Sequence, residues 1–362
     1  MKKVLLIGES YSGGVKTYID TIMENSEGIP RVRVFAMVSS VRLDSGESQG
    51  EGYFIEDNLS FGKSPWKLIK AVKATHGIVR SEAIDVIHAN STFAGMLMYV
   101  YSFYNPKLSF LYTPHGYYSF KKMGRAKKYA VQLIEKRINK VADQVIHVSP
   151  REEREALSEK LVDQDKSVVI LNGVKPPDRM PGRETQGIFT VVNLARVDDQ
   201  KNPFDFIDIA REVAGISRDI QFIWAGSGEH LEEARGRVRK YGLEEQVKFI
   251  GFTADKDRIL RHADLYLSTS HYEGLPFAAV EAMSYKLPLL LTDVIGHTDL
   301  MDGSNGLLFK GKGDPALYDF IAQLLGDKEI WQSLSAGSYR VFSERFNTHQ
   351  MMKRLSEVYG VL

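Results

Sequence analysis

The chain has 362 residues, of which 43% are hydrophobic and 26% charged, so it has the composition of a globular protein and enough length for two cores. The net charge of +1 argues against a polyanion-binding protein, and the absence of cysteine excludes disulfides, thiolate metal sites and a cysteine nucleophile. No apolar run approaches the roughly 18 residues of a membrane span, and the short run after Met1 is a first strand rather than a secretory signal. We therefore expect a cytoplasmic protein.

The first half of the chain alternates short apolar runs with longer mixed segments. This alternation predicts a parallel, doubly wound α/β sheet, because each strand is followed by a helix that crosses back over the sheet. We expect a helix near 64–79 and a polar, glycine- and serine-rich loop over 39–62. The predicted strands are 4–8, 33–38, 84–88, 110–113, 144–148 and 167–171.

Two turns at strand ends carry candidate ligand groups in this half. Gly13 and Gly14 close the turn after the first strand, where backbone N–H groups could meet a phosphate, although a simple tight turn explains them nearly as well. The turn lacks the G-x-G-x-x-G spacing of a dinucleotide site. His115 follows the strand 110–113, and a lone histidine is more often a structural hydrogen-bonding group than a catalytic one.

Residues 121–140 form a basic segment, with eight lysines and arginines against Glu135. Apolar residues recur through it at helical spacing, which predicts an amphipathic helix. Such a helix could lie on the anionic inner face of the cell membrane, or it could pack on the core with a solvated basic face, and the residues favour neither. Nucleic acid is a poorer candidate partner, because no recognition motif accompanies the charge.

Breaker residues divide the chain. Asn172-Gly173 and Pro176-Pro177 interrupt regular structure and predict a domain boundary. The predicted parts are an N-terminal Rossmann-like domain over 1–174, a linker over 175–187, a C-terminal Rossmann-like domain over 188–345 and a helix over 346–362.

The second half repeats the alternation of strands and helices. Arg196 and Lys201 flank the loop after its first strand, where a guanidinium and an ammonium could grip a diphosphate; two surface cations beside aspartates are an equal alternative. Gly226, Phe252 and Thr253 follow later strands. Because the carboxyl ends of parallel strands meet at one edge of a sheet, all these turns can line the same crevice.

Residues 264–283 are the most informative stretch. An apolar run predicts a buried strand, and a turn with Glu273 leads into a helix with Pro276 near its first position and Glu281 about two turns into it. Two glutamates at this spacing arise easily by chance in a glutamate-rich chain. The spacing is therefore informative only together with the strand and the turn.

The strand, the turn 273–276 and the residues 281–283 together resemble the signature of the retaining glycosyltransferases of family four, which have the GT-B fold. The resemblance implies two Rossmann-like, doubly wound α/β domains facing a central cleft, with the acceptor on the side of the first domain, the donor on the side of the second, and the helix 346–362 crossing back to the first domain. It is strong over 188–309 and limited to isolated turns in the first domain. Lys286 and Asp299 stand where the family usually has glycine and glutamate, which leaves the choice of substrate open.

The resemblance also implies a role for each candidate residue. Arg196 and Lys201 would hold the donor's diphosphate, and Glu281 would hold the ribose. Glu273 and the N–H groups after it would hold the sugar. His115 would reach the same sugar from the other domain. The glycine turns and the Phe252–Thr253 loop would close on the diphosphate and the base. The implied catalytic residues are Glu273, His115, Arg196 and Lys201, and the implied donor-binding residues are Gly13, Gly14, Arg196, Lys201, Gly226, Phe252, Thr253, Gly274, Leu275, Pro276 and Glu281.

The predicted function is transfer of a hexose, with retention, from a nucleoside diphosphate sugar to a hydroxyl of a growing glycan such as a surface polysaccharide on a lipid carrier. UDP is the favoured nucleotide, and neither a metal nor a cofactor is expected. Whether Glu273 is a nucleophile or a positioning group stays open. The alternatives are a nucleotide-sugar epimerase of the same fold and a non-catalytic nucleotide-sugar-binding protein.

Overall fold

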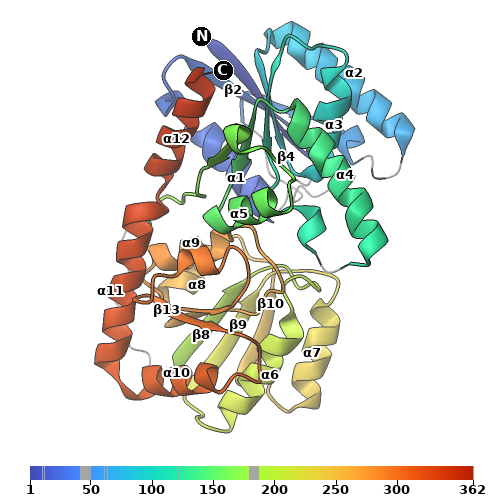
Figure 1. The fold of residues 1–362 in the computed structure, drawn as a ribbon. Helices are drawn as coiled ribbons and strands as arrows, with labels where there is room; N and C mark the ends of the chain where they lie inside the picture. Colours follow the sequence, from blue (N-terminus) through green and yellow to red (C-terminus); the bar gives the residue numbers. More distant parts are fainter. Residues whose placement is uncertain are drawn as a thin grey trace. The chain divides into compact units, whose positions relative to one another are not determined.

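The structure, a computed structural model, describes residues 1–9, 11, 13–40, 50–60, 62, 64–121, 123–178 and 187–361. By their contacts the residues divide into two compact units. Unit 1 comprises Met1–Asn172 together with Thr348–Leu362, and unit 2 comprises Gly173–Asn347. Both ends of the chain therefore belong to unit 1 (Figure 1). Most of the predicted linker, residues 179–186, lies outside the described residues.

Unit 1 is built on a parallel sheet. Its described strands are β1 (Lys2–Gly8), β2 (Val32–Val38), β3 (Tyr53–Ile55), β4 (Val86–Asn90), β5 (Ser109–Thr113), β6 (Gln144–His147) and β7 (Ser167–Val169), in the order β3-β2-β1-β4-β5-β6-β7. The order reverses between β1 and β4, which is the switch point at which open α/β sheets bind ligands. β3 is a correction, because it lies inside the segment 39–62 that we expected to be loop; the part 41–49 lies outside the described residues.

Helices cover this sheet. They are α1 (Gly13–Glu24), α2 (Pro65–Glu82), α3 (Thr92–Ser102), α4 (Arg125–Val141), α5 (Pro150–Ser158) and α12 (Thr348–Val361). The central strands β1 and β4 are buried for most or all of their length, as a sheet with helices on its faces requires, whereas the edge strands β3 and β7 are only partly buried. Strands of this kind read in the sequence as continuous apolar runs, which is why they could be predicted.

Unit 2 repeats the architecture. Its described strands are β8 (Phe189–Leu194), β9 (Ile220–Ala225), β10 (Val247–Gly251), β11 (Leu265–Ser268), β12 (Leu289–Thr292) and β13 (Gly306–Phe309), all parallel, in the order β10-β9-β8-β11-β12-β13. The switch point of this sheet lies between β8 and β11. These are the strands that precede the Arg196–Lys201 loop and the Glu273 turn, so the topology brings both turns to one place.

The helices of unit 2 are α6 (Pro203–Ala214), α7 (Leu231–Lys240), α8 (Lys256–Arg261), α9 (Phe277–Ser284), α10 (Pro315–Gly326) and α11 (Lys328–Arg345). Aromatic residues fill the core beneath α6. Phe206 meets Trp224 edge-on at 5.1 Å between ring centroids, and Trp224 stacks on Phe249 at 5.6 Å. Trp224 also donates its indole N–H to the carbonyl of Ala195 (2.8 Å), which anchors the start of the loop after β8 to the core.

Several helices begin at a polar residue followed by proline. Ser64, Ser149, Asn202 and Asp314 each accept a backbone N–H of the first turn with the side chain, and each is followed by proline at the first helical position. The cap satisfies an N–H that has no partner within the helix, and proline lacks an N–H that would need one. These helix starts can be recognised in the sequence, and they hold the loops at the strand ends in place.

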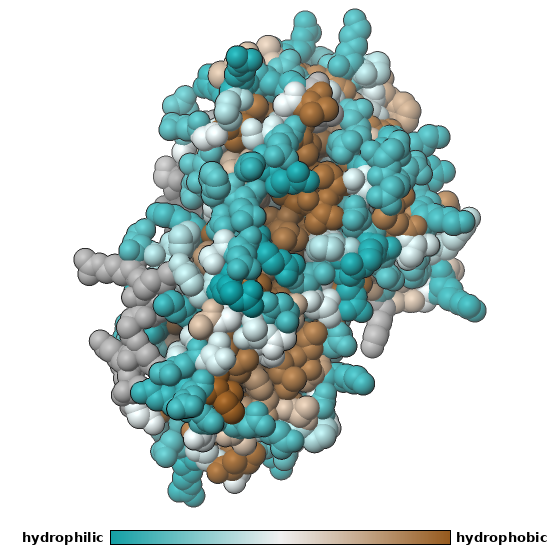
Figure 2. Space-filling model, turned by 60° about the vertical axis from the view of Figure 1, so that its left-hand side comes forward, coloured by the Kyte–Doolittle hydropathy of each residue, from teal (hydrophilic) through white to brown (hydrophobic). Residues whose placement is uncertain are grey.

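Hydrophilic residues predominate on the face shown in Figure 2, and hydrophobic patches lie among them. More than half of a folded protein's accessible surface is ordinarily apolar, so such patches alone do not indicate a docking site. Among the helices of the described residues, none combines the length and the apolar character that crossing a membrane requires.

Candidate active site

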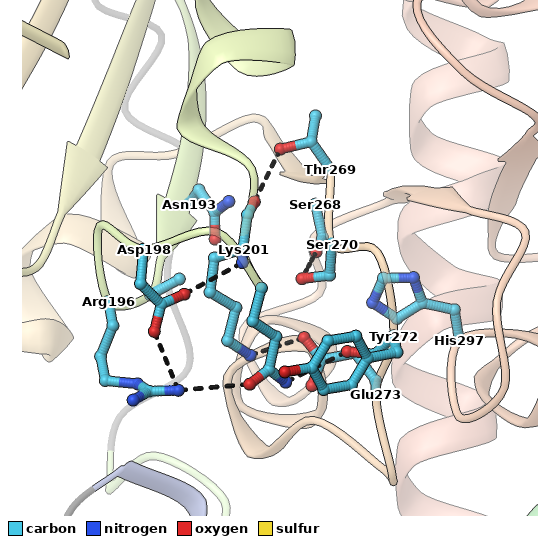
Figure 3. A network of polar contacts seen from close by, with 12 residues as sticks. Asn193, Arg196, Asp198, Lys201, Ser268, Thr269, Ser270, Tyr272, Glu273 and His297 are labelled. Atoms are coloured by element: carbon cyan, nitrogen blue, oxygen red, sulfur yellow. Dashed lines mark hydrogen bonds and ion pairs between the residues drawn. The ribbon is translucent and has the colours of Figure 1, made fainter. Parts of the chain in front are cut away.

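The candidate active site lies at the switch point of unit 2. Tyr266 on β11 pairs with Val192 on β8, so the loops that follow these two strands leave the sheet side by side. One loop carries Arg196 and Lys201, and the other carries Glu273. Figure 3 shows side chains of the two loops pointing toward one another.

The first loop presents both cations from a tight turn. The Lys201 N–H donates to Asp198 Oδ1 (3.1 Å), and the same carboxylate lies 3.0 Å from the Arg196 guanidinium. Asn202 follows in the left-handed conformation with φ at 52°, and its side chain accepts the N–H of Asp205 to cap α6. Arg196 is about half exposed, so its guanidinium is accessible to a ligand.

Lys201 and Glu273 form a buried ion pair. Lys201 Nζ lies 2.5 Å from Glu273 Oε1, and the two side chains are only 18% and 7% exposed. Burial, the largest influence, would raise the pKa of Glu273, but the Lys201 cation together with His297 and a hydrogen bond from Ser270 outweighs it, and the pKa lies below its usual range. Glu273 is therefore ionised at neutral pH, and its charge depends on the cation beside it.

Further hydrogen bonds join the two loops (Figure 3). The backbone of Gln200 accepts the N–H of His271 (2.9 Å), and its side chain donates to the carbonyl of Tyr272 (3.1 Å) and accepts from Arg196 (3.2 Å). Thr269 donates to the carbonyls of the first loop at Lys201 (3.0 Å) and Asn202 (2.8 Å). The loops thus form one hydrogen-bonded unit, which fixes the position of both charged groups.

The start of α9 fits the expected place of Pro276 near the first position but not the expected place of Glu281. Pro276 has extended backbone angles and precedes the first helical residue, Phe277, so it is the N-cap rather than part of the helix. Glu281 is consequently the fifth residue of α9, little more than one turn from its start rather than two. Its carboxylate lies 3.2 Å from Lys256 Nζ and is largely buried. Gly274 and Leu275 lie in the turn between Glu273 and this helix.

The glycines of the next loop allow backbones to approach closely. A β-carbon on Gly226, whose φ is +153°, would lie 1.9 Å from the carbonyl oxygen of Ala195. The N–H of Gly226 donates to the carbonyl of Gly251 (2.8 Å). The loops after β8, β9 and β10 are therefore neighbours at the carboxyl edge of the sheet. Phe252, 60% exposed, and Thr253 follow directly. These residues share the edge of the sheet with the Lys201–Glu273 pair.

Two residues of the network were not among the candidate residues. Gln200 joins both loops, and the only sign of it in the sequence is a polar residue between two cations. His297 is fully buried and follows Gly296, a turn glycine whose added β-carbon would lie 2.0 Å from the carbonyl oxygen of Gly274. This backbone contact joins two glycines that are far apart along the chain, so no local sequence pattern predicts it.

The remaining candidates lie in unit 1. His115 follows β5 with φ at 54°, and its Nε2 lies 3.1 Å from Asn90 Oδ1 at the end of β4. The Tyr18 ring stands edge-on to it at 4.6 Å, and burial lowers the pKa of His115 to about 3, so the ring is neutral at physiological pH. Glu152 accepts the N–H of Gly116 (2.6 Å), which ties this turn to α5.

Gly13 and Gly14 form the exposed first residues of α1, directly beyond β1. Gly13 has φ at +55°, and an added β-carbon would meet no atom within 4 Å. The left-handed conformation explains the glycine, and the open space leaves room for a ligand near the N-terminus of the helix. The structure thus divides the candidates: Arg196, Lys201, Gly226, Phe252, Thr253, Glu273–Pro276 and Glu281 share unit 2, whereas Gly13, Gly14 and His115 belong to unit 1.

Among the described residues, one group of carboxylates and histidine is compact enough to hold a metal ion, namely Asp199, Glu229 and His230. Both carboxylates are exposed, and the His230 ring already lies 2.8 Å from Asp199 and 3.3 Å from Glu233. The hydrogen bond to Asp199 raises the pKa of His230, and a protonated ring is a poor metal ligand. These contacts account for the group as an ion-pair cluster.

Two doubly wound units, with a cationic loop and a buried carboxylate at the switch point of the second, are an arrangement typical of nucleotide-binding α/β proteins. Comparison with known proteins is more specific. Residues 12–176 match the family model described as Glycosyltransferase Family 4, and residues 177–341 match the model described as Glycosyl transferases group 1. The chain belongs to the glycosyltransferases of the GT-B fold.

Curated relatives are glycosyltransferases as well. The Escherichia coli UDP-Gal:alpha-D-GlcNAc-diphosphoundecaprenol alpha-1,3-galactosyltransferase is 21% identical over 310 residues, which cover 81% of this chain and 79% of that protein. The 2-deoxystreptamine N-acetyl-D-glucosaminyltransferase of Niallia circulans is 27% identical, but the match covers only 49% of this chain and 46% of the relative.

Solved structures confirm the predicted fold. Anabaena Alr3699/HepE in complex with UDP and glucose superimposes with a TM-score of 0.80 at 19% identity and covers all of both chains. The sucrose-phosphate synthase of Thermosynechococcus elongatus gives a TM-score of 0.85 at 18% identity, covering 99% of this chain and 98% of that one. At such low identity the likeness shows the fold and nothing finer.

Proposed function

We propose that this glycosyltransferase transfers a hexose, with retention of anomeric configuration, from a UDP-sugar to a hydroxyl of a growing glycan on a lipid carrier. The observation that carries the proposal is the buried Lys201–Glu273 pair beside the accessible Arg196 at the switch point of unit 2. A cation pair can hold a diphosphate, and an adjacent ionised carboxylate can accept hydrogen bonds from sugar hydroxyls.

The proposed reaction needs little from the protein beyond placed charges. The bond between the anomeric carbon and the β-phosphate oxygen breaks, the acceptor oxygen bonds to the same face of that carbon, and the acceptor's proton passes to the departing diphosphate. Arg196 and Lys201 stabilise the charge that develops on the diphosphate. Glu273 and the N–H groups at Gly274, Leu275 and the start of α9 orient the sugar.

Other candidate residues complete the donor site in this proposal. Glu281 accepts hydrogen bonds from the ribose hydroxyls. To do so, its carboxylate must either bind the ribose and Lys256 together or give up its ion pair with Lys256. The turn at Gly226 closes on the nucleotide, and Phe252 with Thr253 contacts the base. His115, kept neutral by burial, contributes a hydrogen bond to the sugar, and Gly13 with Gly14 contributes backbone N–H groups; both assignments rest on the resemblance and on the places of these residues at strand ends.

The names of similar proteins support the choice of UDP and of a lipid-linked acceptor. The E. coli relative is named for UDP-Gal and for a GlcNAc-diphosphoundecaprenol acceptor. Other curated relatives are named for O-antigen biosynthesis, and a similar structure holds UDP and glucose. We extend these chemistries to this chain as a proposal.

Direct assay tests the proposal. Purified protein is incubated with UDP-glucose, UDP-galactose or UDP-GlcNAc and GlcNAc-diphosphoundecaprenol, with GDP- and ADP-sugars as controls. We expect one UDP-sugar to give a product whose new linkage is α by NMR, with activity unchanged by EDTA. Arg196→Ala and Glu273→Ala should each lower kcat/KM by at least about a hundredfold, which is the usual cost of removing one group that stabilises a transition state.

Three results would contradict parts of this proposal. An inverted linkage would exclude retention, and loss of activity in EDTA that added metal restores would exclude metal independence. Interconversion of the sugar nucleotide without an acceptor would identify an epimerase. Unchanged transfer by both alanine variants would remove the site assignment.

We also propose that α4 rests on an anionic bilayer. Its buried side holds Glu135, Ile138 and Asn139, whereas Tyr129 (65% exposed), Leu133 and Ile134 face outward among the basic residues. The helix is thus packed on the core by one side and presents cations with apolar groups on another. Negative lipid headgroups match that charge, and the apolar side chains can enter the headgroup layer.

A further inference from the structure

Among the described residues, His297 has hydrogen-bond partners at one ring nitrogen and none at the other. Its Nδ1 lies 2.8 Å from the carbonyl oxygen of Thr292 and 3.2 Å from Thr292 Oγ1. The Thr292 hydroxyl donates to the carbonyl of Ser270 (2.7 Å), so it can only accept from the histidine. Nδ1 therefore carries the hydrogen, and Nε2 of the neutral ring is a bare acceptor.

This Nε2 atom is buried and has no hydrogen-bond partner among the described residues. A buried polar atom without a partner costs about 1–3 kcal/mol, so it calls for an explanation. The ring is directed toward Ser270 and Glu273 (Figure 3). The turn before it cannot draw back, since Gly296 packs directly on the backbone of Gly274.

The charged groups facing His297 are Glu273 and Lys201. Burial, the largest influence, lowers the pKa of His297; the Glu273 carboxylate and the hydrogen bond to Thr292 raise it; and the Lys201 cation lowers it by a smaller amount, with the balance on the lowered side. The same cation neutralises Glu273, to which it lies at 2.5 Å. Lys201 thus opposes protonation of His297 and favours the ionised form of Glu273, so its departure shifts the histidine toward the charged form.

We propose that His297 is a positioning residue that replaces Lys201 as the cationic partner of Glu273 when Lys201 turns to the diphosphate of the donor. The inference rests on the proposed role of Lys201 in donor binding. When the ammonium leaves, a proton from solvent binds at Nε2, Nδ1–H keeps its bond to Thr292, and the imidazolium faces the carboxylate. Glu273 then stays ionised and fixed in place while the sugar binds beside it.

Proton uptake linked to binding makes affinity depend on pH. The bound state holds one more proton than the free state between the two pKa values of His297, so UDP binds more tightly as pH falls through that window, by up to about tenfold per unit. A purely structural histidine, which only anchors the loop to Thr292, predicts no such slope.

The test is calorimetric titration with UDP from pH 6 to 9, in buffers of different ionisation enthalpy. His297→Asn is the decisive variant, because its amide can keep the bond to Thr292 but cannot be protonated. We expect the wild-type protein to take up about one proton more than this variant near neutral pH, with affinities that converge at high pH. His230→Asn, on the neighbouring loop, is the control and should behave as wild type. The terminal phosphate of UDP titrates equally in every comparison and cancels.

Equal uptake in the wild-type protein and His297→Asn would overturn the inference while leaving UDP binding intact. Absence of UDP binding by the wild-type protein would instead overturn the proposed function, and the inference with it. A measurement on the wild-type protein alone covers the case of a variant that does not fold. In ¹⁵N spectra of the histidine rings, UDP should convert one Nδ1–H tautomer to imidazolium, and a set of rings whose protonation does not change would refute the proposal.

Discussion

At the scale of single residues, the state of Glu273 depends on Lys201. A buried carboxylate that loses its neighbouring cation keeps its desolvation cost and, until a proton binds nearby, loses the attraction that offsets it. The neighbouring pair of Lys256 and Glu281 differs because Lys256 is about half exposed, so solvent screens it. The two pairs therefore form a matched comparison within one site.

We predict that Lys201→Met lowers the free energy of unfolding by about 3–5 kcal/mol at pH 7.5, whereas Lys256→Met lowers it by less than about 1 kcal/mol. Urea unfolding of both variants measures this. Glu273→Gln added to Lys201→Met should restore most of the loss, because the unpaired charge is then absent.

The pH dependence follows from the direction of the pKa shift. In the wild-type protein the pKa of Glu273 is depressed, so the pair's contribution is present above the unfolded pKa of about 4.3 and is lost as pH falls through the folded value. In Lys201→Met the cation that depresses this pKa is gone, so as pH falls the variant takes up a proton, at His297 or at the Glu273 carboxyl, and regains stability. The difference between the two proteins should shrink between pH 7.5 and 5, and a constant difference would refute this account.

Gly296 allows a second prediction at this scale. Gly296 and Gly303 have nearly the same φ, +85° and +88°, but a β-carbon would lie 2.0 Å from the Gly274 carbonyl in the first case and meet nothing within 4 Å in the second. Gly303→Ala should cost about 1–2 kcal/mol for the left-handed backbone alone. Gly296→Ala should cost about 1–3 kcal/mol more and weaken UDP binding, because the Glu273–Gly274 turn must move. Thermal unfolding and calorimetry measure both, and equal effects of the two substitutions would show that the close approach is unimportant.

At the scale of elements, α4 is buried on one side and presents basic and apolar side chains on the other. We predict that Arg137→Glu with Lys140→Glu weakens binding to vesicles containing phosphatidylglycerol by at least roughly thirtyfold, since each cation near an anionic surface contributes about 1 kcal/mol. Both side chains are exposed, so folding should be unaffected. Vesicle co-sedimentation measures the effect.

The matched control places the same reversal on another helix. Arg239 and Lys240, exposed at the end of α7 in unit 2, are replaced by glutamate in the same way. This variant should keep most of its vesicle binding. If the two double variants lose affinity equally, the attraction is a property of total charge and not of α4.

At the scale of the whole molecule, unit 1 needs both ends of the chain. Lys2 on β1 donates to the carbonyl of Tyr359 on α12 (3.0 Å), and the buried hydroxyl of Tyr359 lies 2.9 Å from His88 Nδ1 on β4. His88 Nε2 in turn meets Thr113 Oγ1 (2.8 Å) at the end of β5, just before the turn that carries His115. The last helix of the chain is thereby bonded to the strands that support the unit 1 candidates.

We predict that Tyr359→Phe lowers the stability of unit 1 by about 1–3 kcal/mol, because it leaves a buried nitrogen of His88 without its partner. Hydrogen exchange followed by mass spectrometry should show faster exchange in β4 and β5 and unchanged exchange in β8 and β11. Tyr129→Phe, whose hydroxyl lies on the exposed side of α4, is the control. Faster exchange in unit 2 would contradict the assignment of α12 to unit 1.

The amino-acid sequence alone determined the elements and much of the chemistry of this protein. Buried parallel strands appear as continuous apolar runs, Ser, Asn or Asp before proline marks helix starts, and the turn 273–276 after a strand indicated the family; these signals are local, so a reader of the chain can find them. The tertiary structure alone decided which groups meet. Lys201 pairs with Glu273 because β8 and β11 are neighbours at a switch point, and Gln200 and His297 join them through backbone contacts between loops. α12 belongs with unit 1 for the same reason: pairing across long stretches of chain depends on sheet order and packing, which no short segment contains.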